Sequence, residues 1–222
     1  MSLSSSKIQA GLSKLNLTGK LKIGVLSLQG DYQKHFDILS MVDNVDPFFV
    51  RLPRDLEECD GLIIPGGEST TVGKLMDRYG LDIAIKKKCN QGMTLYGTCT
   101  GMILMAKEIE GSSQHRLSLL DISVKRNAFG RQIDSFETDI KIPEISSDYI
   151  RAVFIRAPIV TQVGDRVEVL ARLDNGGIIM VRQDNLVASA FHPELTDNTS
   201  IHKWFCNLTA QYKSNQLDIV KQ

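Results

Sequence analysis

The stretch from Met93 to Ile109 places a strand, a tight turn and a helix in direct succession, which restricts the folds open to the chain. MTLY is short and apolar and predicts a buried strand, whereas GMILMAKEI has the composition of a helix. The turn between them reads YGTCTG, with Gly97 and Gly101 two residues to either side of Cys99. Small flanking residues are typical of a nucleophile held on a strained strand-to-helix turn, because larger side chains would collide there. The pattern favours a parallel sheet with a reactive residue at its carboxyl edge.

The rest of the chain repeats this alternation of apolar strands and amphipathic helices. In the first half we expect strands at 21–28, 47–52, 61–65 and 93–96, and helices at 31–42, 70–78, 81–90 and 101–109. In the second half we expect strands at 122–126, 136–142, 152–157, 167–173, 177–182 and 186–191, and a helix at 199–212. This order predicts one α/β domain over residues 21–222: three layers, with an open, mostly parallel sheet and helices on both faces.

Residues 1–20 differ in composition, with five Ser, three Lys and no acidic residue. They resemble a weak targeting presequence, but they contain no Arg and no clear cleavage signal. We interpret them as a flexible or short helical extension.

The charge balance and the cysteine content exclude several classes of function. Lys+Arg and Asp+Glu both number 26, so net charge gives no reason to expect nucleic acid or an anionic membrane as partner. None of the four cysteines forms a C-x-x-C pair, which argues against a zinc or redox site. So few cysteines in a chain of this length indicate a reducing, cytoplasmic location rather than a disulfide framework.

Cys99 has two interpretations at this point. As a nucleophile it would benefit from the partial positive charge of a helix N-terminus, and the N–H of Thr100 could donate to an oxyanion. As a structural residue it would be a core cysteine in a glycine-rich turn. The structural interpretation is favoured for Cys59, Cys89 and Cys206, which lack this setting.

A second unusual stretch is IIPGGEST at 63–70, where a strand ends in Pro-Gly-Gly before a helix begins. Two glycines allow backbone N–H groups to turn toward a ligand. The spacing is not that of a P-loop, and a plain turn with a Ser/Thr helix cap would read the same way. Next to Cys99, the loop would supply the other half of an oxyanion hole.

A cysteine nucleophile needs a base, and the chain has four histidines. Only His192 directly follows a predicted buried strand, and Glu194 lies two residues on, where it can orient the imidazole. We interpret His35 as structural or as a partner contact, and His115 and His202 as surface residues.

Taken in order, PGGEST, GTCTG and FHPEL resemble the class I, triad-type glutamine amidotransferases, which hydrolyse glutamine on a flavodoxin-like sheet and pass ammonia to a synthase. GVLSLQGD (24–31), RNAFGRQ (126–132), DSFE (134–137) and FIRAP (154–158) narrow the resemblance. They resemble the glutaminase subunits of pyridoxal 5′-phosphate synthases, over nearly all of 21–212.

The resemblance implies a role for each matching residue. Cys99 would be the nucleophile, His192 the general base and then acid, and Glu194 the residue that orients His192. The backbone N–H groups of Gly67 and Thr100 would form the oxyanion hole. No metal or cofactor is required.

The same resemblance implies a glutamine-binding set. Its members would be Gly67, Glu68, Ser69, Arg126, Ile155 and Arg156. Arg126 suits the substrate's α-carboxylate, because a guanidinium can pair with it through two parallel hydrogen bonds. One position departs from the family, which usually has alanine where this chain has Thr100.

The implied partner is a (β/α)-barrel synthase subunit, which combines ammonia with ribose 5-phosphate and glyceraldehyde 3-phosphate to make pyridoxal 5′-phosphate. Glutaminase activity in this family is weak until the synthase docks, so we expect an interface near the site that includes parts of 24–36. The alternatives are an amidotransferase of purine, pyrimidine or histidine synthesis, a silent scaffold relative, and, less favoured, a cysteine peptidase or chaperone-like hydrolase.

Overall fold

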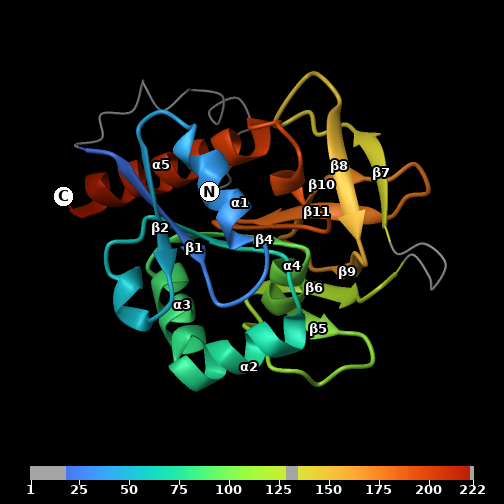
Figure 1. Ribbon diagram of the computed structural model, residues 1–222, viewed down its shortest axis with the longest axis horizontal. Helices are drawn as coiled ribbons and strands as arrows, with labels where there is room; N and C mark the ends of the chain where they lie inside the picture. Colours follow the sequence, from blue (N-terminus) through green and yellow to red (C-terminus); the bar gives the residue numbers. More distant parts are fainter. Residues whose placement is uncertain (1–18, 129–134, 221–222) are drawn as a thin grey trace.

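The protein is a three-layer α/β structure, seen here in a computed structural model that describes residues 19–128 and 135–220, with side chains up to residue 216. One large sheet runs through the molecule (Figure 1). Helices α1 and α5 lie on one face of it, and α2, α3 and α4 lie on the other. The predicted fold class is confirmed.

The bounds of the elements follow the predicted order closely in the first half of the chain. The strands are β1 (Leu21–Leu26), β2 (Val45–Val50), β3 (Gly61–Ile64), β4 (Thr94–Thr98), β5 (Ala106–Ile109), β6 (Leu120–Lys125), β7 (Ser135–Ile140), β8 (Ile150–Ile155), β9 (Ile159–Val163), β10 (Glu168–Arg172), β11 (Ile178–Gln183) and β12 (Leu186–Ser189). The helices are α1 (Tyr32–Ser40), α2 (Ser69–Tyr79), α3 (Leu81–Asn90), α4 (Thr100–Met105) and α5 (Ser200–Val220), with short 3₁₀ turns η3 (Pro53–Leu56) and η4 (Pro193–Leu195).

The strands β2-β1-β3-β4-β12 form the parallel half of the sheet, in that order. Every residue of β3, β4 and β12 is buried, because helices cover both faces, and this explains their continuous apolar sequences. The sheet continues through β11, β9, β6 and β5, with β10 on β11, and includes antiparallel pairs. The hairpin β7-β8 forms a separate small sheet.

The structure differs from the prediction most clearly in two helix ends and one strand. The helix expected at 101–109 ends at Met105, and residues 106–109 form β5, because pairing with β6 overrides their helical propensity. Strand β9 was not predicted, although it pairs with β6 and β11. Helix α5 continues to Val220 rather than ending near 212.

Within the part of the chain that the structure describes, no helix is both long and apolar enough to cross a membrane.

Candidate active site

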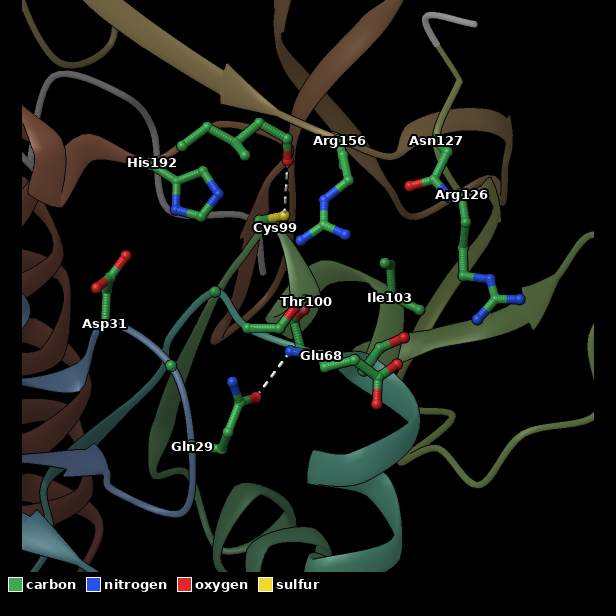
Figure 2. Close-up of a pocket in the computed structure, with 15 residues that line it drawn as sticks. Gln29, Asp31, Glu68, Cys99, Thr100, Ile103, Arg126, Asn127, Arg156 and His192 are labelled. Atoms are coloured by element: carbon green, nitrogen blue, oxygen red, sulfur yellow. Dashed lines mark hydrogen bonds between the residues drawn. The ribbon is translucent and has the colours of Figure 1, made fainter. Parts of the chain in front are cut away.

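Four polar segments follow the carboxyl ends of strands β1, β3, β4 and β12. Because these strands are parallel, the four segments meet at one edge of the sheet. Strands β3, β4 and β12 are adjacent, and β1 lies next to β3. Their carboxyl ends surround a pocket of about 430 Å³ (Figure 2). The residues that line it are Gln29, Gly30, Asp31, Gly66, Gly67, Glu68, Ser69, Cys99, Thr100, Ile103, Arg126, Asn127, Ile155, Arg156 and His192.

The turn at Cys99 has the strained geometry that its glycine-flanked sequence predicts. Cys99 has φ 47° and ψ −96°, a conformation that non-glycine residues rarely adopt. A Cβ on Gly97 would lie 2.5 Å from the carbonyl carbon of Gly101, and one on Gly101 would lie 2.4 Å from the Ile64 oxygen. Gly97 therefore allows the close approach of β4 and α4, and Gly101 allows that of α4 and β3. The turn aims the Cys99 sulfur into the pocket (Figure 2).

His192 and Glu194 form the second part of the site. The Nδ1 of His192 lies 2.7 Å from Oε1 of Glu194, and the backbone N–H of His192 donates to the Val153 carbonyl at 2.8 Å. Burial would lower the pKa of His192, but hydrogen bonds with Cys99 and Glu194 outweigh it and raise the pKa to about 10. The imidazole is therefore charged at neutral pH, and a charged imidazole stabilises a neighbouring thiolate.

The other three cysteines differ from Cys99 in their surroundings. All are buried and free, and burial raises the pKa of Cys59, Cys89 and Cys206 to about 12. They behave as small apolar residues, as the sequence indicates.

The glycine loop is held against the loop that follows β1. The Glu68 N–H donates to Oε1 of Gln29 at 2.7 Å, and the Asp31 N–H donates to the Gly66 carbonyl at 3.3 Å. Gly30 has φ +99°, and a Cβ there would lie 1.7 Å from the Gly66 oxygen. These contacts fix the backbone of Gly66 and Gly67 beside Cys99.

Thr100 adds a contact that alanine could not make. Its hydroxyl donates to the carbonyl of Gly67 at 2.5 Å. As the first residue of α4, Thr100 also has an N–H without an acceptor inside its own helix. The threonine thus joins the cysteine turn to the glycine loop across the two halves of the expected oxyanion hole.

We expect Thr100→Val to lower the turnover number at this site about fivefold with little change in KM, because it removes one hydrogen bond while keeping the branched shape. Steady-state kinetics of Thr100→Val and of Thr100→Ser, which keeps the hydroxyl and loses the branch, separate the effect of the hydrogen bond from that of the side-chain shape. Equal activity of the two variants would contradict a role for the hydroxyl.

Glu68 is placed at the pocket, but its carboxylate caps α2. It accepts from the backbone N–H groups of Thr70 and Thr71 at 3.0 and 2.7 Å, and from the Thr71 hydroxyl at 2.6 Å. The Thr71 hydroxyl is the main cause that lowers the pKa of Glu68 to about 2. The Glu68 carboxylate therefore shapes the loop and keeps its charge at neutral pH.

Arg126 lies on the far side of the pocket from His192 (Figure 2). Its guanidinium donates to Oε1 of Gln114 at 2.8 Å, and the same oxygen accepts from Ser69 at 3.3 Å. The sequence analysis missed Gln114, which lies in a loop without any motif. Of RNAFGRQ, residues 129–132 lie outside the described residues, as does Asp134 of DSFE.

Ile155 and Arg156 close the pocket above the cysteine. The Ile155 carbonyl is 3.8 Å from the Cys99 sulfur, and Arg156 has φ 43°, which turns the chain at the end of β8. His192 and Arg156 lie on opposite sides of Cys99 (Figure 2).

One other histidine contradicts its sequence interpretation, and His35 fits the structural role expected for it. His202, expected at the surface, is wholly buried, and so is His35; their Nε2 and Nδ1 atoms are 2.9 Å apart. They belong to α5 and α1, which pack together next to η4. His115 is partly exposed, and its Nε2 lies 3.2 Å from Oδ2 of Asp82.

Burial also makes the stability of the protein depend on pH. It lowers the pKa of His202 from 6.5 to about 3. Between these values the unfolded chain binds a proton that the folded chain does not, so stability falls as pH falls, by up to about 1.4 kcal/mol per pH unit. Urea unfolding near pH 7 and pH 5 measures this loss. His202→Gln should show a smaller loss; an unchanged loss would contradict the assignment.

Among the residues that the structure describes, two groups of side chains have metal-ligand spacing, with donor atoms within 4.8 Å of one another: Asp31, His192 and Glu194, and Asp77, Asp82 and His115. In the first, His192 and Glu194 already bind each other, and in the second, Asp82 pairs with His115. The chemistry derived below needs neither as a metal site.

The fold and the pocket together define a class of protein: a three-layer α/β protein with a cysteine on a strained turn at the carboxyl edge of the parallel sheet, a histidine after the neighbouring strand and a carboxylate beside that histidine. The chain belongs to the SNO glutamine amidotransferase family, whose sequence profile matches residues 25–211.

Curated relatives and solved structures agree with this membership. Pyridoxal 5'-phosphate synthase subunit PdxT of Carboxydothermus hydrogenoformans is 50% identical over 185 residues, which are 83% of this chain and 96% of the relative. The PdxT of Thermotoga petrophila is 44% identical and covers 85% of this chain and 99% of its own. A crystal structure described as a glutamine amidotransferase is 44% identical, with TM-score 0.80, and covers 84% of this chain and 98% of its own.

Proposed function

We propose that this protein hydrolyses L-glutamine to L-glutamate and ammonia with Cys99, His192 and Glu194, as the glutaminase subunit of a pyridoxal 5′-phosphate synthase. The observation that carries the proposal is the strained Cys99 turn beside a His192 whose Nδ1 lies 2.7 Å from the Glu194 carboxylate. Family membership and the names of the curated relatives support the choice of reaction and pathway. The glutaminase domain spans residues 21–222.

The first half of the reaction forms a thioester. The Cys99 thiolate attacks the side-chain amide carbon of glutamine, and the N–H groups of Gly67 and Thr100 donate to the developing oxyanion. Each such donor contributes about 3 kcal/mol to transition-state stabilisation. His192, charged in the free site, gives its proton to the leaving nitrogen, and ammonia departs.

The second half regenerates the cysteine. Neutral His192 accepts a proton from water as the water attacks the thioester carbonyl. The carbon–sulfur bond then breaks, which releases glutamate and leaves Cys99 as the thiolate. Glu194 keeps the proton of His192 Nδ1 in place, so that Nε2 faces the reacting atoms.

Arg126 should bind the α-carboxylate of glutamine. We expect Arg126→Leu to raise KM for glutamine about 10- to 100-fold with a smaller change in kcat, since the interaction is made equally in the ground and transition states. Initial rates over a range of glutamine concentration measure the two constants. Lys125→Leu, which alters the exposed neighbour, is the matched control; a fall in kcat alone would contradict the assignment.

The ammonia passes to a (β/α)-barrel synthase subunit that docks over the pocket, in a cytoplasmic complex that makes pyridoxal 5′-phosphate from ribose 5-phosphate and glyceraldehyde 3-phosphate. The loop Gln29–Asp31 supports this site of docking, because it borders the pocket and contacts the glycine loop. Ammonia release with and without the purified synthase subunit tests the proposal. Release that increases with the synthase supports it, and strong release unaffected by the synthase would indicate a different amidotransferase.

A further inference from the structure

Behind the triad lies a group of buried titratable side chains that the mechanism above does not use. Oε1 of Glu194 is taken by His192, whereas Oε2 has no well-aligned hydrogen bond among the residues described. Oε2 lies 3.3 Å from Nε2 of His35, and the side chains of both residues are 0% exposed. His35 is the residue best placed to stabilise this second oxygen.

The contacts of His35 determine where its single proton lies when the ring is neutral. Its Nε2 forms a hydrogen bond with Oγ1 of Thr98 at 3.3 Å and lies at the same distance from Oε2 of Glu194, where the alignment is poorer. A carboxylate can only accept, so the proton is favoured on Nε2. Nδ1 then accepts from Nε2–H of His202 at 2.9 Å. The remaining His202 nitrogen, Nδ1, has no partner among the described residues, which suits an unprotonated atom.

We propose that His35 is a positioning residue for the triad: its Nε2–H holds the second carboxylate oxygen of Glu194, and His202 keeps that proton on Nε2. This inference concerns the same site as the proposed function and rests on it for its kinetic consequence. Two imidazoles would then hold the two oxygens of Glu194, one facing the pocket and one facing the core.

The charges around His35 are consistent with a neutral donor. The groups that face it are Glu194, His192, His202 and, farther out, Asp31. Burial is the main cause that lowers the pKa of His35 and of His202, so both rings are neutral at neutral pH. Burial would raise the pKa of Glu194, but its interactions with His35 and His192 outweigh this and lower it.

The first test measures the tautomer directly. Nitrogen NMR of the labelled, partner-free protein near pH 7 distinguishes Nε2–H from Nδ1–H rings. We expect His35 to be neutral with its proton on Nε2. A His35 proton on Nδ1, or a charged His35 ring, would overturn the proposal, and this result requires no variant to fold.

The second test compares His35→Leu, which removes the donor, with His35→Gln, whose amide can donate from a similar position. Loss of the donor should raise the pKa of Glu194. At low pH less of the carboxylate is then charged, and it stabilises the charged form of His192 less. For His35→Leu we expect the acid limb of Cys99 alkylation by iodoacetamide to move up by about one pH unit. We also expect kcat for glutamine to fall roughly tenfold with KM little changed. His35→Gln should keep most of the wild-type alkylation profile and most of the wild-type kcat.

The matched control is Thr209→Val on α5. It removes other buried hydrogen bonds, because Thr209 Oγ1 donates to the Phe205 carbonyl at 2.9 Å and lies 2.6 Å from Thr94 Oγ1, at the opposite end of β4 from Cys99. It should lower thermal stability without moving the pH profile. If His35→Leu keeps the wild-type profile, or if His35→Gln and His35→Leu lose activity equally, His35 has only a packing role and the proposal fails.

The tautomer of His35 and the pH profile of Cys99 alkylation test this proposal separately from the proposed function. Alkylation and the tautomer do not depend on glutamine or on the synthase. If both behave as expected while no ammonia is released under any condition, the glutaminase assignment fails and the positioning role of His35 remains.

Discussion

Cys99→Ala should reduce ammonia release from glutamine by at least about four orders of magnitude, to the level of the uncatalysed blank. The thioester cannot form without the sulfur, and the remaining residues only bind the substrate. The measurement is glutamate and ammonia production with the synthase subunit present, together with a melting temperature. Alanine has the same Cβ as cysteine and adds no strain to a turn with φ 47°, so we expect the variant to remain folded, with its oxyanion loop in place.

Cys89→Ala is the matched control for this change. Cys89 is also buried and free, but burial raises the pKa of its thiol to about 12 and it lies on α3, away from the pocket. It should lose some stability and keep its activity. Activity that survives in Cys99→Ala would reject the cysteine as nucleophile and, with it, the whole mechanism.

Glu194→Gln should lower kcat by about three to four orders of magnitude. The substitution keeps the size of the side chain but removes the charge that helps raise the pKa of His192. At neutral pH less of the imidazole would then be protonated, and its ring would no longer be held with Nε2 toward Cys99. The experiment compares kcat across pH for the variant and the wild type.

A partly buried acid provides the control. Glu144 forms an ion pair with Arg182, outside the pocket, and Glu144→Gln removes a charge of the same kind. It should affect stability and leave kcat unchanged. If Glu194→Gln affects only stability as well, Glu194 is a structural partner of His192 and the third triad position must be reassigned.

The position of the candidate site could be predicted because each motif directly follows an apolar strand. PGGEST follows β3, GTCTG spans the end of β4 and FHPEL follows β12, and neighbouring parallel strands end at the same edge. Local sequence was a poor guide where long-range pairing decides the outcome. Residues 106–109 form a strand at the sheet's edge although their composition is helical.

The buried histidines show the same limit more sharply. DYQKHFD and SIHKWF are amphipathic segments, and nothing in either shows that His35 and His202 meet beneath Glu194. Their burial depends on how α1 and α5 pack beside η4. This packing brings together two histidines that are 167 residues apart in the chain. The role of the Glu68 carboxylate as a helix cap was likewise visible only in the folded loop.

By itself, the sequence determined the order of strands and helices along the first half of the chain, the strained turn at Cys99 and the pairing of His192 with Glu194, since all three depend on residues close together in the chain. Only the tertiary structure decided which polar atoms meet across the pocket: Thr100 with Gly67, Arg126 with Gln114, and His35 with Glu194. The physical reason is that hydrogen bonds between distant segments depend on the packing of whole helices and loops, whereas turns and strands depend on local backbone preference.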